Sequence, residues 1–404
     1  WRSTVWVNDQ RIGALDSLST PHEYDLTSAV ASQVEVNKTH TITIRIDNRI
    51  QKVNVGPNSH SVADHTQSNW NGIVGDIVLS ATDRVWIDDV QVYPNLTTKT
   101  FKAIVTLGNA TGQAGQGRLH VHAKPIDADS SQKVTPVEVP VSLEQDSSST
   151  VSLEGSLGDN PKLWDEFAPN RYRLSIGVSA TTGKTQHEDE TTVDFGVREI
   201  STNGSQFLLN GQTISFRGTL ECCIFPKTGY PPCDVASWRR IIRVCQAHGL
   251  NHIRFHSHCP PEAAFVAADE LGFYFQIECG SWANQGASVG NGEPLDQWIY
   301  EESDRILQAY GNHPSFVLMA YGNEPAGPGR GGRFLGPWVA HFRNQDGRRL
   351  YTSAAGWPIL PENQFHNTPE PRVHAWGMGL KDRLNGQPPA TMTDYRDYIQ
   401  QHNV

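Results

Sequence analysis

The sequence lacks three features, and each absence excludes a class of protein. No run of about 18 apolar residues occurs, so we expect no membrane-spanning helix. Basic residues are not in excess, because 33 Lys and Arg stand against 43 Asp and Glu, a net charge of −10. Nucleic-acid binders carry a basic patch or stripe, so nucleic acid is not an expected partner. The first 221 residues contain no cysteine.

The six cysteines all fall between residues 222 and 279. A secreted domain held by disulfides distributes its bridges more evenly, so we expect buried thiols instead. Zinc is not indicated, because no Cys-x-x-Cys pair is present. His248, His252 and His256 recur every fourth residue, but Gly249 and the strand pattern from His252 onward prevent one helix from presenting them together.

Residues 1–200 show short strands separated by turns. Thr41–Ile46 alternates strictly between polar and apolar residues, which is typical of a half-buried strand. Further strands are predicted at Val5–Val7, Ile77–Leu79, Val85–Ile87 and Val90–Tyr93. Tyr93–Pro94 marks a boundary, and the strand spacing after it favours an immunoglobulin-like sandwich. Its strands are predicted at Phe101–Thr106, Gly117–His122, Val137–Val141 and Tyr172–Val178.

From residue 207 the pattern changes to strands that alternate with helices. Phe207–Gly211 predicts a hairpin, and Asp234 and Gly249 are typical residues for the two ends of a helix. Such alternation with short loops indicates a parallel sheet, here a (β/α)₈ TIM barrel of which six strands can be counted. The strands are expected at Ile214–Thr219, His252–His256, Phe273–Ile277, Phe316–Tyr321, Arg349–Ser353 and Arg372–Trp376, and the helices at Asp234–His248, Pro261–Leu271, Leu295–Tyr310 and Thr393–His402.

Reacting groups in such a barrel come from the C-terminal ends of the strands. The polar residues there are Glu221, Arg254 to His258, Glu278, and the pair Asn323 and Glu324. The last pair follows a bulky apolar strand and precedes Pro325, a place that suits a general acid near a sugar oxygen. A Glu that caps the following turn, or that pairs with an Arg, is the alternative interpretation.

Several motifs resemble glycoside hydrolase family 2, the β-galactosidase, β-glucuronidase and β-mannosidase group. Asn312-His-Pro-Ser-Phe-Val-Leu-Met-Ala-Tyr-Gly-Asn-Glu324 is similar to that family's "NHPS…W.LGNE" signature. Phe207-Leu-Leu-Asn-Gly211 resembles the entry to its barrel, and Asn251-His-Ile-Arg254 with Ser257-His-Cys-Pro260 resembles its second strand. Segments 18–26 and 67–72 resemble its N-terminal sugar-binding jelly roll.

The resemblance implies a multidomain β plus α/β fold. Residues 1–94 would form a partial jelly-roll β-sandwich, 95–200 an immunoglobulin-like sandwich, and 201–404 a partial TIM barrel that ends after about six strands. It also implies a retaining exo-β-glycosidase with two carboxylates about 5–5.5 Å apart. The family nucleophile is a Glu at the end of strand seven, and no residue here matches it. We therefore expect a chain that is incomplete at both ends and inactive alone.

The resemblance also implies roles for individual residues. Glu324 matches the acid/base, Asn323 the amide that holds the sugar 2-OH, and Arg254 the strand-two arginine that supports the carboxylates. Glu278 would support the site or contact substrate, and a structural ion pair is nearly as well favoured. His258, Trp282 and Trp376 are further substrate-binding candidates. Phe255 and His256 add one residue to the common strand-two pattern, which puts the placement of His258 in doubt.

The expected partner is a carbohydrate, and a β-galactoside is favoured over a β-glucuronide, β-mannoside or arabinoside because no Arg or Lys cluster marks a uronate pocket. The mechanism requires no cofactor; some relatives hold Mg²⁺ or Na⁺, whose ligands cannot be assigned here. A carbohydrate-binding protein that has lost catalysis is the alternative function. A periplasmic or secreted location is favoured, with the cytoplasm as the alternative.

Overall fold

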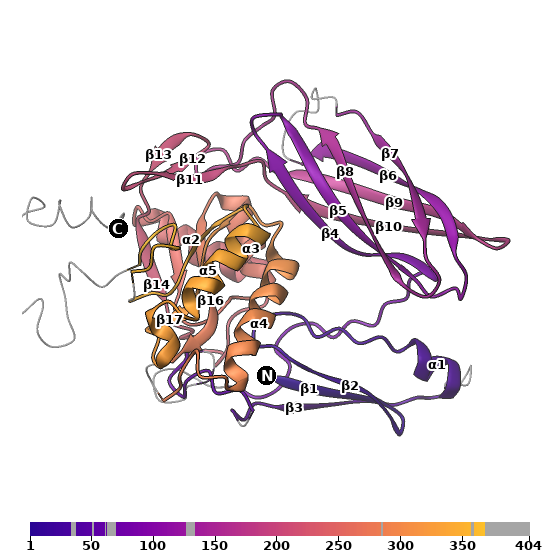
Figure 1. Ribbon diagram of the computed structural model, residues 1–404, viewed down its shortest axis with the longest axis horizontal. Helices are drawn as coiled ribbons and strands as arrows, with labels where there is room; N and C mark the ends of the chain where they lie inside the picture. Colours follow the sequence, from indigo (N-terminus) through magenta and orange to yellow (C-terminus); the bar gives the residue numbers. More distant parts are fainter. Residues whose placement is uncertain are drawn as a thin grey trace, which may run out of the picture.

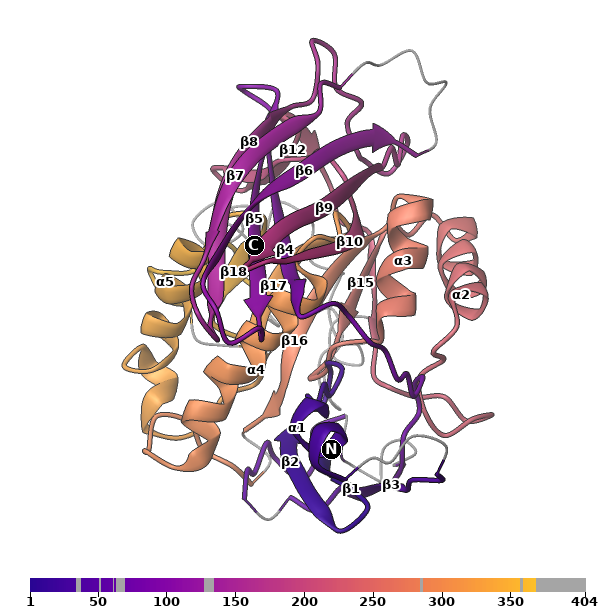
Figure 2. The same ribbon diagram turned by 90° about the vertical axis from the view of Figure 1, so that its right-hand side faces the viewer.

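The computed structural model describes residues 1–33, 38–50, 52–60, 62, 70–126, 134–283, 286–356 and 359–367. They form a small N-terminal sheet, a β-sandwich, and a parallel sheet flanked by helices (Figure 1). The sandwich and the N-terminal sheet lie at opposite ends of the molecule in Figure 2. The strand predicted at Arg372–Trp376 and the helix predicted at Thr393–His402 lie outside the described residues.

The N-terminal sheet has three antiparallel strands in the order β2-β1-β3. A tight turn at Asn8, whose φ is 48°, joins the first two. The strand predicted at Ile77–Leu79 is wrong: these side chains are 71–78% exposed and belong to no strand. An apolar triplet forms a strand only where a neighbour pairs with its backbone. The elements are β1 (Arg2–Val7), β2 (Gln10–Asp16), α1 (Thr27–Gln33) and β3 (Ile42–Asp47).

The sandwich packs a three-stranded sheet, β4-β5-β8, on a four-stranded sheet, β10-β9-β6-β7. Apolar residues from both sheets form one core, as expected for an immunoglobulin-like sandwich. Its strands are β4 (Val85–Asn95), β5 (Thr100–Asn109), β6 (Gly115–Pro125), β7 (Val137–Leu143), β8 (Ser148–Ser156), β9 (Tyr172–Thr182) and β10 (Thr185–Phe195).

The boundary expected at residue 94 falls inside β4. The two strands predicted at 85–87 and 90–93 are one strand with an irregularity after Ile87, and it pairs with β5 along its whole length. Pro94 does not end this pairing because β4 is an edge strand, where a missing N–H is tolerated. The sandwich therefore begins at Val85.

Two antiparallel turns lead from the sandwich into the parallel sheet. The predicted hairpin is formed by β12 and β13, which follow β11. The strand predicted at Ile214–Thr219 divides, because Ile214 ends β13 whereas Gly218 begins the parallel sheet. Between them the Arg217 N–H donates to Asn251 Oδ1 at 2.7 Å, which turns the chain. The strands are β11 (Ile200–Asn203), β12 (Gln206–Leu209) and β13 (Gln212–Ile214).

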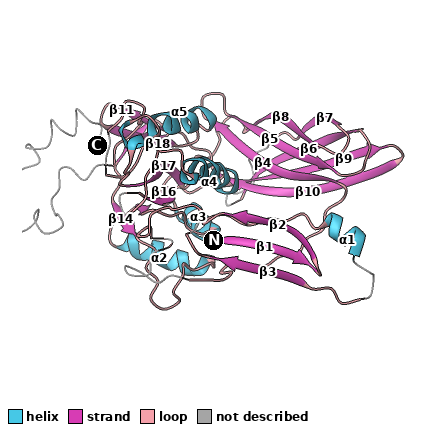
Figure 3. Cartoon of the chain, turned by 60° about the horizontal axis from the view of Figure 1, so that its bottom comes forward, coloured by secondary structure: helices cyan, strands magenta, loops and turns pink. Residues whose placement is uncertain are grey.

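Five parallel strands pair in sequence order, β14-β15-β16-β17-β18, and helices lie alongside them (Figure 3). Every residue of β17 is buried, which is the pattern of a parallel strand covered on both faces. Asp234 caps α2 as predicted, whereas α5 was not predicted. The elements are β14 (Gly218–Glu221), α2 (Val235–Ala247), β15 (His252–Phe255), α3 (Glu262–Leu271), β16 (Tyr274–Trp282), α4 (Pro294–Tyr310), β17 (Phe316–Asn323), a 3₁₀ turn (Pro328–Gly331), α5 (Leu335–Gln345) and β18 (Leu350–Thr352).

The N-terminal sheet is anchored to the parallel sheet through α4. Glu302, which is fully buried, accepts hydrogen bonds from the Ser17 hydroxyl at 2.9 Å and the N–H groups of Leu18 and Ser19 at 2.9 and 3.1 Å. Arg305 donates to its other oxygen at 3.0 Å. This junction places the N-terminal segment close to the ends of the parallel strands.

Candidate functional site at the strand ends

The candidate residues gather at the carboxyl ends of four neighbouring parallel strands. Glu221 ends β14, Arg254 lies near the end of β15, Glu278 lies within β16, and Asn323 ends β17. Parallel pairing in sequence order brings these ends to one edge of the sheet. This edge is where the (β/α) architecture carries its chemistry.

Arg254 joins three of the strands. Its Nε donates to Glu278 Oε1 and its Nη2 donates to Asn323 Oδ1, both at 2.7 Å. Glu278 is fully buried, and its second oxygen accepts the Ser257 N–H at 2.5 Å. Both Glu278 oxygens are therefore occupied. Asn323 Nδ2 is buried and has no hydrogen-bond partner among the described residues, so this amide donor is available to a ligand.

Glu324 follows β17 in a left-handed backbone conformation, with φ at 38°. Such a φ is uncommon for a residue with a side chain and is found where the surroundings enforce it. Here the Glu324 N–H donates to the Ala355 carbonyl at 2.8 Å, and the Ala355 N–H donates to Gly322 at 3.2 Å. The Glu324 carboxylate accepts the Trp282 indole N–H at 2.9 Å. Backbone and side chain are thus both held.

His258 lies against a different carboxylate. Its Nε2 is 2.8 Å from Glu221 Oε2, an ion-pair distance that is not aligned as a hydrogen bond. Its ring also meets Phe255 edge-on, with centroids 5.4 Å apart. The side chain of His258 therefore contacts the β14 and β15 ends, whereas its backbone carbonyl accepts the Glu278 N–H at 3.4 Å.

The additional residue in this loop, His256, packs against Trp282. The two rings meet at 71° with centroids 4.7 Å apart. Burial, and after it the charge of Arg254, lowers the pKa of His256 to about 2. The imidazole is therefore neutral at ordinary pH and acts as an aromatic and hydrogen-bonding group.

Sequence reasoning missed a contribution from the N-terminal region. Ser59 and His60 are buried against the loops that follow β15 and β16, and the His60 ring stacks on Trp282. No periodicity or motif in the sequence links residue 60 to residue 282. Only the tertiary structure brings them together.

The structure thus brings Arg254, Glu278 and Asn323 into one group and Trp282 onto Glu324, while His258 pairs with Glu221. Trp376 lies outside the described residues.

Three expectations from the sequence concern the cysteines, metal binding and membrane-spanning helices. All six cysteines are free; Cys223, Cys259 and Cys279 are buried but Cys233 is exposed, so the expectation of buried thiols holds only in part. The described ranges contain no cluster of three or more His, Cys, Asp or Glu that could hold a metal ion. No helix within those ranges is long and apolar enough to cross a membrane.

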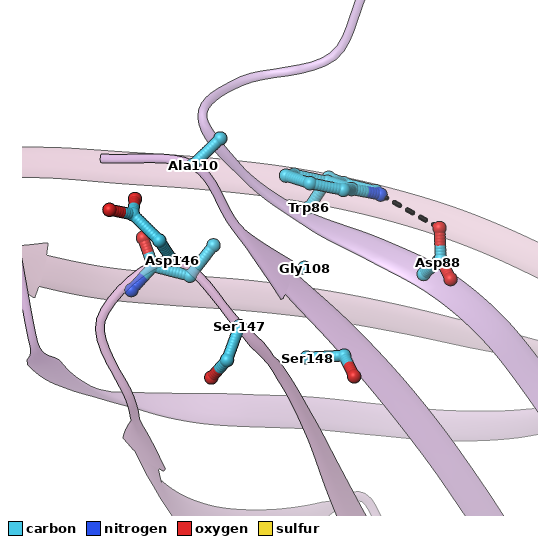
Figure 4. Close-up of a pocket in the computed structure, with 8 residues that line it drawn as sticks. Trp86, Asp88, Gly108, Ala110, Asp146, Ser147 and Ser148 are labelled. Carbon is cyan, nitrogen blue, oxygen red and sulfur yellow. Dashed lines mark hydrogen bonds between the residues drawn. The ribbon is translucent and has the colours of Figure 1, made fainter. Parts of the chain in front are cut away.

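Two hollows lie away from the strand ends. One is on the sandwich, beside Trp86 and Asp146 (Figure 4). The other lies between the sandwich and the parallel sheet, beside Arg198 and Arg348. In the second hollow both arginines already donate to carbonyl groups, Arg198 to Pro314 and Phe316, and Arg348 to Val92. Neither hollow is lined by the carboxylates at the strand ends.

Comparison with known proteins agrees with this architecture. The sequence model "Glycosyl hydrolases family 2" matches residues 85–198, the sandwich. The β-galactosidase large subunit of Latilactobacillus sakei is 24% identical over 402 residues, which cover 95% of this chain and 58% of that protein. A putative β-glucuronidase of Formosa agariphila is 24% identical and covers 85% of this chain and 38% of its own length. This chain spans about three-fifths of the first relative and about two-fifths of the second.

Solved structures show the same fold. The family 2 β-galacturonidase of Eisenbergiella tayi, bound to galacturonate, superposes with a TM-score of 0.69 at 18% identity, over 88% of this chain and 59% of that one. The shared fold is that of a multidomain protein rich in β-strands. Together, the family model over the sandwich, the sequence matches and this fold support membership of glycoside hydrolase family 2.

Proposed function

We propose that this chain carries the acid/base half of a retaining exo-β-glycosidase that removes a terminal β-linked sugar. One observation carries the proposal: the Glu324 carboxylate, directly after β17, is held by the Trp282 indole N–H, and the neighbouring Asn323 Nδ2 has no partner among the described residues. A fixed carboxyl group beside an available donor is what protonation of a glycosidic oxygen needs.

Glu324 acts twice in this mechanism. In the first step its protonated form donates a proton to the leaving-group oxygen; in the second it takes a proton from the attacking water. The Trp282 indole N–H holds the carboxylate in place through both steps. Asn323 Nδ2 donates to the sugar 2-OH, a contact that gains strength in the transition state.

Glu278 serves as support rather than as the nucleophile. Arg254 and the Ser257 N–H occupy its two oxygens, and it is fully buried, so attack on an anomeric carbon would require breaking these bonds. The retaining mechanism therefore needs a carboxylate beyond those described at the strand ends.

A β-galactoside is the substrate we favour. The L. sakei relative that covers 95% of the chain is a β-galactosidase subunit. Two donors of Arg254, the arginine at these strand ends, are already taken by Glu278 and Asn323, so it is a poor ligand for a uronate carboxylate. A β-glucuronide, β-mannoside or arabinoside is the alternative substrate.

A carbohydrate-binding protein without catalysis is the second candidate. It is favoured by the pairing of the other two strand-end carboxylates, Glu221 with His258 and Glu278 with Arg254. Of the three carboxylates described at the strand ends, Glu324 is then the one left for acid/base chemistry, whereas a retaining mechanism needs two carboxylates.

Hydrolysis of aryl β-galactosides by the whole protein that contains this chain tests the proposal. Glu324→Gln should lower kcat strongly with poor leaving groups and much less with activated ones, because general-acid help matters most for the former. Glu262→Gln, an exposed residue on α3, is the control and should change neither. Equal loss on both substrate types would contradict the acid/base role. Sugar binding without hydrolysis of any of the four sugars would favour the second candidate.

A further inference from the structure

A segment of the N-terminal region, residues 53–60, reaches the candidate site from outside the parallel sheet. The Trp282 backbone N–H donates to the Val55 carbonyl at 2.8 Å, and the Ser281 hydroxyl donates to the same oxygen at 3.3 Å. Gly56 has a φ of 100°, and a Cβ there would overlap the Trp282 carbonyl oxygen. Only glycine allows this approach, so the end of β16 is fixed by the N-terminal segment.

Ser59 and His60 extend the contact to the next loop. The Ser59 hydroxyl donates to the Gly280 carbonyl at 2.7 Å, and the His60 N–H donates to the Ser257 hydroxyl at 2.9 Å. Ser257 is itself in a left-handed conformation, with φ at 52°, and its N–H donates to Glu278. The segment therefore contacts the C-terminal part of β16, which carries Trp282, and the loop after β15, which carries Ser257.

Three aromatic rings complete the arrangement. His60 stacks on Trp282 with centroids 5.4 Å apart and 20° between the planes. His256 meets His60 edge-on at 4.4 Å and Trp282 at 4.7 Å. The indole thus packs against two imidazoles that also contact each other. This packing restricts its rotation and keeps its N–H directed at the Glu324 carboxylate 2.9 Å away.

We infer that His60 is a positioning residue for the acid/base, acting on Glu324 through the ring of Trp282. This inference rests on the proposed function of Glu324. It makes the N-terminal region part of the catalytic unit, because a small misplacement of a reacting group costs far more rate than stability. Loss of the stack should therefore release the Trp282 indole N–H from the Glu324 carboxylate.

The contact between Trp282 and Glu324 can be followed through a spectroscopic signature. In ¹H–¹⁵N spectra of the protein, the Trp282 indole resonance, assigned with Trp282→Phe, should change position in Glu324→Gln, because the acceptor of the indole N–H changes from a carboxylate to an amide.

This effect of Glu324→Gln on the Trp282 resonance should be largely lost in His60→Ala, because the indole is no longer held against the carboxylate. His60→Phe, which keeps an aromatic ring at this position, should retain most of the effect. His120→Ala, on the exposed face of the sandwich, is the matched control and should retain all of it. If His60→Ala does not fold, Ser59→Ala removes the bond to Gly280 without a cavity and should reduce the effect by less.

An effect of undiminished size in folded His60→Ala or Ser59→Ala would overturn the inference, as would an indole resonance that does not respond to Glu324→Gln. In a hydrolytically active protein, His60→Ala should also lower kcat with little change in KM. Loss of the effect in a protein that hydrolyses nothing would leave the positioning role intact and refute the proposed function alone.

A separate observation points to a second site, on the outer face of the sandwich. Trp86, Gly108 and Ser148 lie side by side across β4, β5 and β8. A Cβ on Gly108 would overlap the Trp86 ring, so the glycine lets the indole lie flat over the sheet. Trp86 Nε1 donates to Asp88 Oδ1 at 3.0 Å, which fixes the ring in plane beside the hollow in Figure 4.

Polar atoms surround the Trp86 indole ring. Ser147 Oγ is buried and has no hydrogen-bond partner among the described residues. Asp146, Asp88 and Ser148 are exposed around the same hollow. We propose that the hollow binds a neutral polysaccharide: the C–H face of a sugar stacks on Trp86 and its hydroxyls bond to the surrounding oxygens. The two carboxylates repel a polyuronate.

Affinity electrophoresis tests this second site independently of hydrolysis. Retardation is expected in gels that contain a neutral galactan, glucan or arabinan, but not polygalacturonate. Trp86→Ala should abolish most of it. Phe167→Ala removes an aromatic side chain that is 87% exposed elsewhere on the surface and is the matched control. The site is refuted if none of the neutral polymers retards the protein, if polygalacturonate retards it equally, or if Trp86→Ala migrates like the wild type.

Discussion

Arg254 should be among the most costly residues to replace in the parallel sheet. Its guanidinium makes two charge-assisted hydrogen bonds at 2.7 Å, to Glu278 and to Asn323. Arg254→Met removes both and leaves the Glu278 carboxylate fully buried with only the Ser257 N–H as a partner. Removing one member of a buried ion pair typically costs about 3–5 kcal/mol, because the remaining charge is uncompensated. We expect a loss in that range.

A second substitution tests whether the loss of stability in Arg254→Met comes from the unpaired charge of Glu278. Glu278→Gln alone leaves Arg254 without its anion. Combined with Arg254→Met, the same change makes both positions neutral and keeps an amide oxygen as acceptor for the Ser257 N–H. The double variant should therefore lose less than the sum of the two single variants, by about 1–3 kcal/mol. Arg173→Met is the matched control, because Arg173 pairs with Asp194 on the exposed sandwich surface; it should cost less than about 1 kcal/mol.

Urea unfolding followed by tryptophan fluorescence measures these differences, since Trp238, Trp298 and Trp338 lie in the core of the parallel-sheet region. If Arg254→Met costs no more than Arg173→Met, or if the two changes at 254 and 278 are additive, the charge argument fails. A loss in Arg254→Met that Glu278→Gln does not relieve would point to packing of the arginine stem instead.

Three further predictions concern pH, the domain junction and the backbone at the site. Because burial lowers the pKa of His256 to about 2, the unfolded chain binds a proton between pH 2 and about 6.5 that the folded chain does not. The free energy of unfolding should therefore fall on acidification through this window. His256→Gln should reduce the slope of the unfolding free energy against pH, measured between pH 4 and 6, by up to about 1.4 kcal/mol per pH unit. Glu302→Ala should cost more than about 3 kcal/mol, because three donors from the N-terminal region, that of buried Ser17 and the part-buried N–H groups of Leu18 and Ser19, lose their acceptor; an intact protease-resistant junction in this variant would contradict the anchor. Gly356→Ala should lower activity as well as stability, since Gly356 has a φ of 105° and a Cβ there would lie 3.1 Å from Glu324 Cγ; normal kinetics in the variant would show that Glu324 is not confined from this side.

Much of the fold followed from local pattern. The capping residue Asp234 and the apolar run of β17 each express a pattern among residues close in sequence, and each was predicted. Alternation also predicted strands within β4, β5, β6, β7 and β9 of the sandwich, but β8 and β10 were not predicted. The predictions that were wrong concern segments whose structure depends on pairing with another strand. Ile77–Leu79 has the composition of a strand but belongs to none. Pro94 was predicted to end a domain, but it lies inside an edge strand.

The candidate site divides in the same way. Arg254, Glu278, Asn323 and Glu324 could be named from the sequence because each lies in or directly after the C-terminal half of a parallel strand, and such ends converge whatever the loops do. Their hydrogen bonds could not be named, because distances between side chains depend on how the strands pair and twist. His258 illustrates this point, since only the structure assigns it to Glu221.

By itself, then, the sequence determined which residues stand at the strand ends and which family the chain resembles, since both depend on short segments. Only the tertiary structure placed His60 against Trp282, 222 positions away, and set the indole on Glu324. Such contacts come from the docking of the N-terminal region through Glu302 and Gly56, where hydrogen bonding and close backbone approach select one arrangement. Docking of this kind leaves no periodic signal in a single sequence, because the residues that meet share no helix or strand.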